Sequence, residues 1–441
     1  PGLPDIGVAA SLEASRFATG EVRRVLLDPD RILLPECDWE EAPRRCRIWC
    51  DSDAEFEVLA AGLVERGILE EVDEDIADAM VLRDSEGRPL LAGMFGVEKS
   101  KDEPIIKQGV HVPILRLIFN LVPPNATLKD FDADIRDLPS QGQFGALALL
   151  DREIFLLSSR DRQCFFYVWR VPLSWRKLLF INRVVVRNGL RKRLALTVVG
   201  MGLKPAVTIT QHLHRNILRA GASRGMSISL DSEIRRQRPL PISARSDQRS
   251  AWLVYVDDLK LAEIVDVDEA RVLQALESDF MLEAEEKYAA AGTPGRLDKS
   301  ESRLTSASSL GERIEGELGR RDLPIGYVYD LIGFTLYALR HPLPRKAWQV
   351  LTSRWVRAQG LRKATAGCFD RIWAFVQKNG SSSPARDVVD ELLMAAALAP
   401  LYNSSWRLQI DGMVTASDAS EKAGAVCATI GLSAEGLAFV S

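Results

Sequence analysis

Two adjacent aspartates, Asp257 and Asp258, interrupt an apolar, strand-prone run, "WLVYVDDLKL", at residues 252–261. Adjacent carboxylates repel each other, and burying either one is costly unless it finds a partner. Strand-prone residues flank the pair on both sides, so the run predicts a tight β-hairpin with the aspartates at its turn. There they could bind hard cations such as Mg²⁺, and two such ions about 4 Å apart suit in-line phosphoryl displacement. The alternative is an acidic turn in water, because Asp is a common turn residue.

A third candidate carboxylate, Asp161, stands 96 positions before Asp257 in "SSRDRQCFFYVWRVP". A two-metal site generally draws a further carboxylate from a distant strand. Phe166 follows Asp161 by five positions, within an aromatic run. Both residues also have a structural interpretation, since Asp161 could cap a helix and Phe166 could be a core aromatic.

Two further segments contain residues that suit phosphate binding. In "LRLIFNLVPPN", Arg116 precedes Asn125, and a guanidinium binds phosphate through a fork of donors. In "GMGLKPAVTITQ", a glycine-bearing loop carries Lys204 and leads into a pattern typical of a helix. Lys107 could add a cation before Arg116, although a solvated surface charge is the alternative for both residues.

Histidine and cysteine give little indication of a transition-metal site. His212 and His214, in "TQHLHRN", have no acidic neighbour, so we interpret them as polar positions on a helix. The cysteines nearest one another in sequence form no C-x-x-C pair and lack a nearby histidine. We therefore expect reduced thiols, as in an intracellular protein, rather than zinc. Nothing distinguishes a nuclear from a cytoplasmic location.

The elements that must position these residues can be predicted from periodicity. Helical spacing dominates most of residues 1–90 and the tryptophan-rich stretch 331–378. Short strands are expected in "AGMFGVEKS" and "LRLIFNLV", and one long amphipathic helix in "DVDEARVLQALESDFMLEAEEKYAAAG". The polar segments 231–250 and 292–309 are expected to be loops, the first of them exposed.

Composition favours a folded protein with no membrane span. Of 441 residues, 46% are hydrophobic and 27% charged, and no apolar run approaches the roughly 18 residues that a span requires. The net charge of −4 conceals an asymmetry, because residues 160–249 contain 19 Lys or Arg against four Asp or Glu. This basic stretch predicts either a surface for polyanions or a face with local counter-charges.

The four segments, in this order and spacing, resemble the motifs of reverse transcriptases, the RNA-directed DNA polymerases of retrotransposons and retroviruses. "YVDD" is similar to the family's Tyr-x-Asp-Asp hairpin, and Asp161 with Phe166 to its first palm motif. "GMGLKPAVTITQ" is similar to its Gly-x-Lys loop and helix, and "LRLIFNLVPPN" to a fingers segment. The resemblance implies an α+β right-hand polymerase with palm, fingers and thumb.

The resemblance also implies roles for individual residues. Asp161, Asp257 and Asp258 would hold two Mg²⁺ ions, with Mn²⁺ as an alternative. The residues that would contact the incoming deoxynucleoside triphosphate are Lys107, Arg116, Phe166, Met201, Gly202 and Lys204. Lys299, in "LDKSES", resembles a later palm lysine. The partners would be an RNA or DNA template with its primer, and other parts of a polyprotein.

Several positions depart from the family's pattern. Met201 stands where the family usually has Gln, so an amide that helps to position the nucleotide is missing. Asn120 and Val122 stand where Asp and a basic residue are common. These changes leave two functions open: an active polymerase, or a catalytically inactive nucleic-acid-binding relic. Some other Mg²⁺-dependent nucleotidyltransferase would explain the carboxylates but not the order of the motifs.

The chain is expected to divide into four parts. These are a mainly helical extension (1–90), fingers and palm (91–320), a helical thumb and connection (321–400), and a segment resembling the start of ribonuclease H (401–441). In the last part, "VTASDASEKAGAV" resembles the first hairpin of that domain, with Asp418 as one of its carboxylates. We expect this domain to be truncated here and the chain to be a fragment of a longer product.

Overall fold

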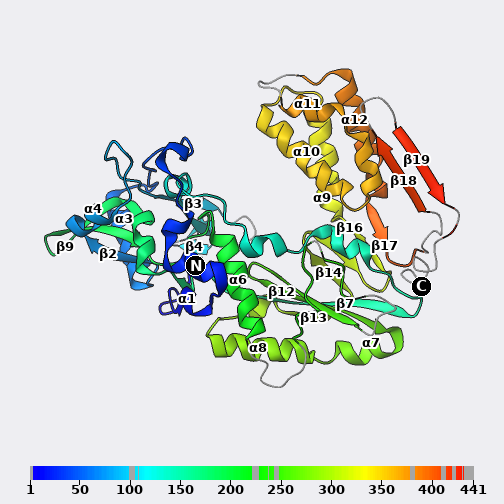
Figure 1. Ribbon diagram of the computed structural model, residues 1–441, viewed down its shortest axis with the longest axis horizontal. Helices are drawn as coiled ribbons and strands as arrows, with labels where there is room; N and C mark the ends of the chain where they lie inside the picture. Colours follow the sequence, from blue (N-terminus) through cyan, green and yellow to red (C-terminus); the bar gives the residue numbers. More distant parts are fainter. Residues whose placement is uncertain are drawn as a thin grey trace.

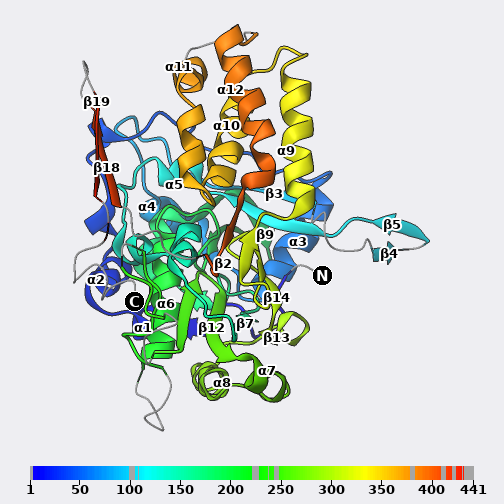
Figure 2. The same cartoon turned by 90° about the vertical axis from the view of Figure 1, so that its right-hand side faces the viewer.

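The computed structural model describes residues 3–98, 105–107, 109–220, 228–236, 238–242, 248–377, 383–408, 414–419, 424–429 and 431. Two lobes stand apart in Figure 1. Most of residues 12–98 and the strands of residues 180–196 lie to the left, and a sheet that includes residues 153–161, with helices beneath it, lies at the lower right. A bundle of helices rises above that sheet in Figures 1 and 2.

A four-stranded antiparallel sheet carries the candidate site. Its strand order is β11–β12–β7–β13, where the strands are β11 (Ser250–Tyr255), β12 (Asp258–Asp266), β7 (Glu153–Asp161) and β13 (Glu301–Leu304). β12 and β7 pair over nine consecutive positions, from Asp258 opposite Asp161 to Asp266 opposite Glu153. This long ladder fixes the relative register of the two strands that carry Asp161 and Asp258.

Both faces of this sheet are covered, which explains the continuous apolar runs within β7 and β11. On one face, Trp252 and Leu261 join a core shared with the helices α6 (Ala206–Arg219) and α8 (Asp279–Ala291). On the other face, Leu253 and Phe155 pack in a second core with Trp406. Asp161 and Asp258 therefore lie at one end of the two central strands of this sheet. The sheet is rigid because both of its faces are covered.

Residues 12–196, apart from β7, form short helices and small sheets. Two strands, β2 and β9, flank β10 in a three-stranded sheet, β3 pairs with β6, β4 with β5, and β1 with β8. The helices are α1 (Ala14–Phe17), α2 (Gly20–Leu27), α3 (Asp53–Glu65), α4 (Glu74–Met80), α5 (Val122–Asn125), and the 3-10 helices η1 (Pro29–Ile32), η2 (Glu36–Asp38), η3 (Ala133–Asp137) and η4 (Gln141–Ala146). The strands are β1 (Leu12–Glu13), β2 (Leu69–Asp73), β3 (Gly93–Glu98), β4 (Ile105–Lys107), β5 (Val110–Val112), β6 (Leu115–Asn120), β8 (Trp169–Arg170), β9 (Phe180–Arg187) and β10 (Leu190–Leu196). The hairpin β4–β5 projects from the body of the molecule in Figure 2.

The C-terminal part combines a second antiparallel sheet, of order β14–β15–β16–β17, with a helical bundle. Its strands are β14 (Ser306–Ser309), β15 (Glu312–Glu315), β16 (Arg320–Asp322) and β17 (Asn403–Ser405). The bundle contains α9 (Ile325–Ala338), α10 (Arg345–Gln359), α11 (Arg371–Gln377) and α12 (Arg386–Ala397), with the 3-10 helices η7 (Lys363–Cys368) and η8 (Ala399–Leu401). Trp348 and Trp355 are fully buried at its centre. The hairpin of β18 (Val414–Ala419) and β19 (Gly424–Thr429) lies beside the bundle in Figure 1.

Three predictions of local structure were wrong. The expected long helix is two helices, α7 (Val267–Gln274) and α8, because the Ser278 hydroxyl accepts from the Met281 N–H and starts a new helix. The expected loop 292–309 contains the 3-10 helix η6 (Leu297–Lys299), β13 and β14. The supposedly exposed segment 231–250 contributes buried Glu233 to the interior. The strands expected in residues 92–122 and the helices expected in 331–378 are confirmed.

Many basic residues of the stretch 160–249 form ion pairs with acidic residues from the first ninety. Arg176 pairs with Glu70, Arg187 with Glu57 and Glu71, and further pairs of this kind are Lys177–Asp30, Arg183–Asp53, Arg191–Glu74, Lys192–Asp73 and Arg193–Asp78. Local counter-charges therefore explain most of the asymmetry that the sequence displays. In the part of the chain that the structure describes, no helix is both long and apolar enough to cross a membrane.

Candidate active site

The predicted hairpin is confirmed, and it brings the candidate carboxylates together. Tyr255 pairs with Asp258, which leaves Val256 and Asp257 as a two-residue turn between β11 and β12. Asp258 begins β12 directly opposite Asp161, the last residue of β7. We refer to Asp161, Asp257 and Asp258 as the aspartate cluster.

The aspartate cluster carries more negative charge than its surroundings compensate. Burial, followed by repulsion from Asp258 and Asp161, raises the pKa of Asp257 to about 6. Burial also raises the pKa of Asp258, against the attraction of Lys260. The ammonium of Lys299 lies 2.8 Å from Asp161 Oδ2, and it is the ion-pair partner of that carboxylate.

The cluster fits a hard divalent cation by its donors and its charge, although its side chains do not form a closed cage. Among the described residues, no group of three or more His, Cys, Asp or Glu side chains is arranged as a formed metal site. Carboxylate oxygens are the ligands that Mg²⁺ prefers, and the pKa of Asp257 is raised first by burial and then by the neighbouring carboxylates, which a bound cation would offset. Asp161, Asp257 and Asp258 are therefore the residues that would hold Mg²⁺.

The turn itself is strained. Val256 has φ of 59°, a left-handed conformation that is rare for a β-branched residue and costs on the order of 1–3 kcal/mol. Two-residue hairpin turns need such a conformation at their first central position, where Gly is usual. The surrounding structure must therefore hold Val256 in place.

Helix α6 supplies two side chains that hold the turn. Gln211 donates from Nε2 to the Val254 carbonyl (2.9 Å) and accepts from the Val256 N–H at Oε1 (2.8 Å). His214, one helical turn later, bonds from Nδ1 to the Val256 carbonyl (2.8 Å) and from Nε2 to the Tyr288 hydroxyl (2.5 Å). Gln211 is the last residue of the motif "GMGLKPAVTITQ", whereas the sequence analysis interprets His214 as a polar helix position and gives no signal for Tyr288.

The glycine loop before α6 is fixed by Asn125. Its side-chain amide donates to the Gly202 carbonyl and its side-chain oxygen accepts from the Lys204 N–H, each over 2.7 Å. Gly202 has φ of 96°, which explains why glycine is needed there. The Lys204 ammonium faces away from the turn, toward Glu40 (3.0 Å) and Asp130 (3.3 Å).

The other predicted nucleotide-binding residues differ in their exposure to solvent. Phe166 is half-buried against the main core, whereas neighbouring Phe165 is fully buried against His214 and Trp169. Arg116 is exposed on β6 and close enough to Tyr167 to oppose the rise that burial causes in the pKa of that phenol. Met201 is 37% exposed.

Two predicted residues can be placed only by their backbone. Lys107 ends β4, and Asp418 lies in β18 opposite Ala425. The side chains of both lie outside the described part of the structure.

One groove runs from Asp258 of the aspartate cluster to Arg357 on α10, and a second groove lies along α10. The first, of about 640 Å³, is lined by Pro139, Ser140, Tyr255, Asp258, Lys260, Ser308, Leu310, Gly311 and Arg357. The second, of about 460 Å³, lies along α10 and is lined by Tyr327, Lys346, Gln349, Val350, Ser353, Arg354 and Arg357. Arg357 lines both and donates to the Gly311 carbonyl, so the grooves meet at this residue.

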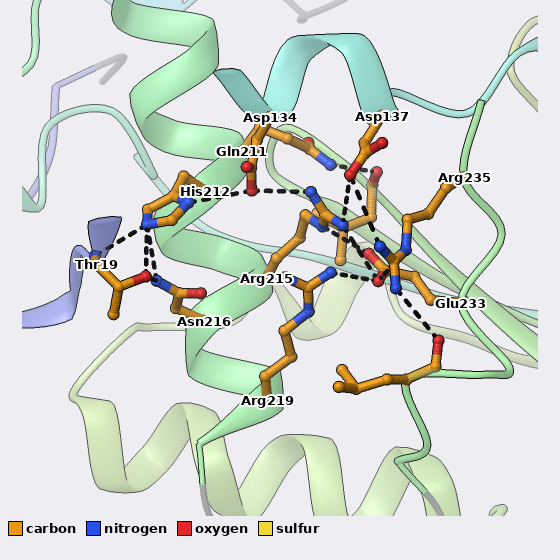
Figure 3. Close-up of polar contacts among 12 residues, drawn as sticks. Thr19, Asp134, Asp137, Gln211, His212, Arg215, Asn216, Arg219, Glu233 and Arg235 are labelled. Carbon is orange, nitrogen blue, oxygen red and sulfur yellow. Dashed lines mark hydrogen bonds and ion pairs between the residues drawn. The ribbon is translucent and has the colours of Figure 1, made fainter. Parts of the chain in front are cut away.

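A neighbouring face of α6 carries a network of full charges around the buried Arg215, drawn in Figure 3. The side chain of Arg215, only 1% exposed, reaches Asp134 (2.8 Å), Asp137 (2.9 Å) and Glu233 (2.6 Å). Glu233 also pairs with Arg219 and Arg235. We refer to these six residues as the α6 ion network.

His212 is attached to the edge of the α6 ion network. Its Nδ1 contacts Asp134 at 3.1 Å, and its Nε2 accepts from the Asn216 amide at 2.9 Å and from the Thr19 N–H at 3.0 Å. These contacts place His212 in a structural role within the described residues (Figure 3).

Comparison with known proteins identifies the fold but no family. No family model and no curated protein matches the sequence. A foamy viral protease–reverse transcriptase in complex with double-stranded DNA is similar in structure, with a TM-score of 0.52 at 14% identity, over 97% of this chain and 67% of that one. A second foamy viral protease–reverse transcriptase in complex with double-stranded DNA matches with a TM-score of 0.50 at 14% identity, over 97% and 79%. The chain therefore has a reverse transcriptase-like fold.

Proposed function

We propose that this protein is an RNA-directed DNA polymerase that extends a primer by nucleotidyl transfer at the aspartate cluster. The observation that carries the proposal is the register of β7 and β12, which sets Asp161 opposite Asp258 with Asp257 at the adjoining turn. Three carboxylates at the edge of a rigid sheet, with too little compensating charge, suit metal-assisted phosphoryl transfer. The right-hand arrangement of palm, fingers and thumb belongs to the same proposal.

In this proposal the chain positions the reactants. Asp161, Asp257 and Asp258 would hold two Mg²⁺ ions, which when bound would activate the primer 3′-hydroxyl and neutralise charge on the triphosphate. Lys299, already paired with Asp161, would move to the leaving phosphates. Arg116 would hold the triphosphate from the side of β6.

In this proposal the primer–template duplex would lie along the two grooves. Lys346, Arg354 and Arg357 present cations along α10, and phosphate contacts from such residues position a duplex without reading its sequence. The foamy viral proteins of similar structure bind double-stranded DNA, which supports a duplex as the partner here. Deoxynucleoside triphosphates would enter beside Phe166.

Primer extension on an RNA template with Mg²⁺ tests the proposal. Wild-type protein should add deoxynucleotides, and chelation or Asp161→Asn should abolish the addition, since the metal-binding charge would be lost. Equal activity of Asp161→Asn and wild type would exclude the aspartate cluster as the site. A wild-type protein that binds duplex but never extends it would exclude the polymerase.

The role of Phe166 can be tested against its neighbour. A ring beside the sugar would exclude a 2′-hydroxyl sterically, so Phe166→Val should raise ribonucleotide incorporation relative to deoxyribonucleotide. Phe165→Val is the matched control, because Phe165 is core and the cavity left by its truncation should lower stability without changing sugar preference. An unchanged preference in active Phe166→Val protein would refute the contact with the sugar.

One observation favours a second candidate, a nucleic-acid-binding protein that no longer catalyses. Met201 offers no amide to a nucleotide, and the ammonium of Lys204 is engaged by Glu40 and Asp130. Duplex binding in the wild-type protein without extension, under either Mg²⁺ or Mn²⁺, is the outcome that distinguishes this candidate.

A further inference from the structure

His214 joins the strained turn to the interior through both of its ring nitrogens. The Val256 carbonyl can only accept a hydrogen bond, so Nδ1 must carry the proton, and Nε2 then accepts from the Tyr288 hydroxyl. The imidazole is completely buried, and burial lowers its pKa to about 3. It is therefore neutral and held in one tautomer.

Tyr288 is itself locked by the residue that follows Asp161. The guanidinium of Arg162 lies 4.0 Å from the centre of the Tyr288 ring and binds both oxygens of Glu285 on α8. The backbone N–H of Arg162 donates to the Asp257 carbonyl at 3.1 Å. A closed circuit therefore runs from Asp257 through Arg162, Tyr288 and His214 back to Val256.

This circuit satisfies backbone groups that the hairpin cannot satisfy within itself. Val256 is held at its carbonyl by His214 and at its N–H by Gln211, and Asp257 is held at its carbonyl by Arg162. Because a β-branched residue disfavours φ of 59°, loss of either Val256 bond would let the turn relax. The carboxylate of Asp257 would then move relative to that of Asp161.

We propose that His214 is a positioning residue for Asp257, acting through the Val256 carbonyl, and that the Tyr288 hydroxyl sets the tautomer that allows this. The inference rests on the proposed polymerase function for the expected effect on kcat. The tautomer of His214, and the Tyr288 hydroxyl that sets it, can be tested without any activity. The reverse tautomer would direct a lone pair of Nδ1 at the carbonyl oxygen and remove the bond.

Two substitutions at position 214 separate positioning from packing. In His214→Asn the amide nitrogen takes the place of Nδ1 and can still donate to Val256, whereas in His214→Gln it takes the place of Nε2 and cannot. Misplacement of a reacting group by about 1 Å costs up to about 100-fold in rate. We therefore expect kcat to fall 10- to 100-fold in His214→Gln, but about threefold or less in His214→Asn, with KM and duplex Kd unchanged in both.

The melting temperatures of the two variants provide the control. Both remove the ring, so both should lose a similar amount of stability, and a merely structural role would lower their activities equally. Equal kcat values in folded His214→Asn and His214→Gln would overturn the inference.

Nitrogen NMR of the histidine side chains tests the tautomer without activity. The chain has only four histidines, which keeps the spectrum assignable. We expect the Nδ1–H form for His214 in wild type and a mixture of forms in Tyr288→Phe. An Nε2–H form in wild type would overturn the inference even if extension is observed, and the Nδ1–H form in an inactive protein would leave it standing while the polymerase proposal fails.

Discussion

The aspartate cluster and the α6 ion network each bring together three carboxylates that are at least partly buried, but only in the network are those carboxylates balanced by cations. In the network, Arg215, Arg219 and Arg235 balance the three acids. Although burial alone would raise the pKa of Asp134, His212 and Arg215 bring it below its usual value. In the cluster, the pKa of Asp257 is raised to about 6.

This difference separates a structural from a functional use of buried charge. A balanced network stabilises a single arrangement, and removing one partner leaves an uncompensated buried ion. An unbalanced cluster is unfavourable in isolation and persists because the sheet and α6 hold it in place. The same substitution, acid to amide, should therefore have opposite consequences at the two sites.

The largest effect is expected at the aspartate cluster. Asp257→Asn should lower primer extension by about 10³-fold or more, since a lost charge removes transition-state stabilisation. It should leave the melting temperature unchanged or raise it, because repulsion from Asp258 and Asp161 is relieved. A clear loss of stability in Asp257→Asn would contradict the contrast between the two sites.

The next effect is expected in the α6 ion network. Glu233→Gln should destabilise the protein by about 3–5 kcal/mol in chemical denaturation, because three arginines lose their shared partner. Asp132→Asn is the matched control, since Asp132 pairs with Arg136 on the surface, and it should cost less than about 1 kcal/mol. Equal costs for the two variants would show that the network is not a balanced, buried unit.

His214, which contacts the turn of the aspartate cluster, adds a dependence of stability on pH. Its folded pKa of about 3 lies below the unfolded value near 6.5, so its contribution is complete above pH 6.5 and declines as the pH falls toward 3. The wild-type free energy of unfolding should therefore fall between pH 7 and pH 5 by about 2 kcal/mol more than that of His214→Asn. A parallel fall in both proteins would show that His214 is protonated in the folded state.

The smallest effect concerns charges that neither site uses. Arg354→Ala should weaken duplex binding only a few-fold at moderate salt and reduce the slope of log Kd against log salt by about one, because one phosphate contact is lost. Arg183→Ala is the control, since Arg183 pairs with Asp53 and should leave the slope unchanged. Equal slopes for all three proteins would exclude α10 from the duplex path.

The sequence predicts the aspartate cluster because its chemistry is local. "YVDD" between strand-prone runs determines a hairpin, and the long apolar stretch before Asp161 provides the strand that pairs with it. The positioning residues were missed because their partners lie far away in the chain. His214 is 42 residues from Val256 and 74 from Tyr288, and nothing in "TQHLHRN" indicates either contact.

Charge patterns were the least informative part of the sequence. The basic stretch of residues 160–249 is neutralised by residues that precede it by more than a hundred positions, such as Glu70 beside Arg176. The polar appearance of residues 231–250 concealed the buried Glu233 for the same reason, since its arginine partners Arg215 and Arg219 belong to another element. Composition reports the number of charges but not their pairing.

The nine paired positions of β7 and β12 also limit how the length of this chain can vary. Deleting one residue between Asp258 and Asp266 would exchange the two faces of the strand beyond it, so that Lys260, Ala262 and Ile264 would leave the side they share with Asp258. Added residues can be absorbed between α7 and α8, where a connection already interrupts the helices. Insertion scanning should therefore find a segment of nearly constant length bounded by regions whose length can change freely.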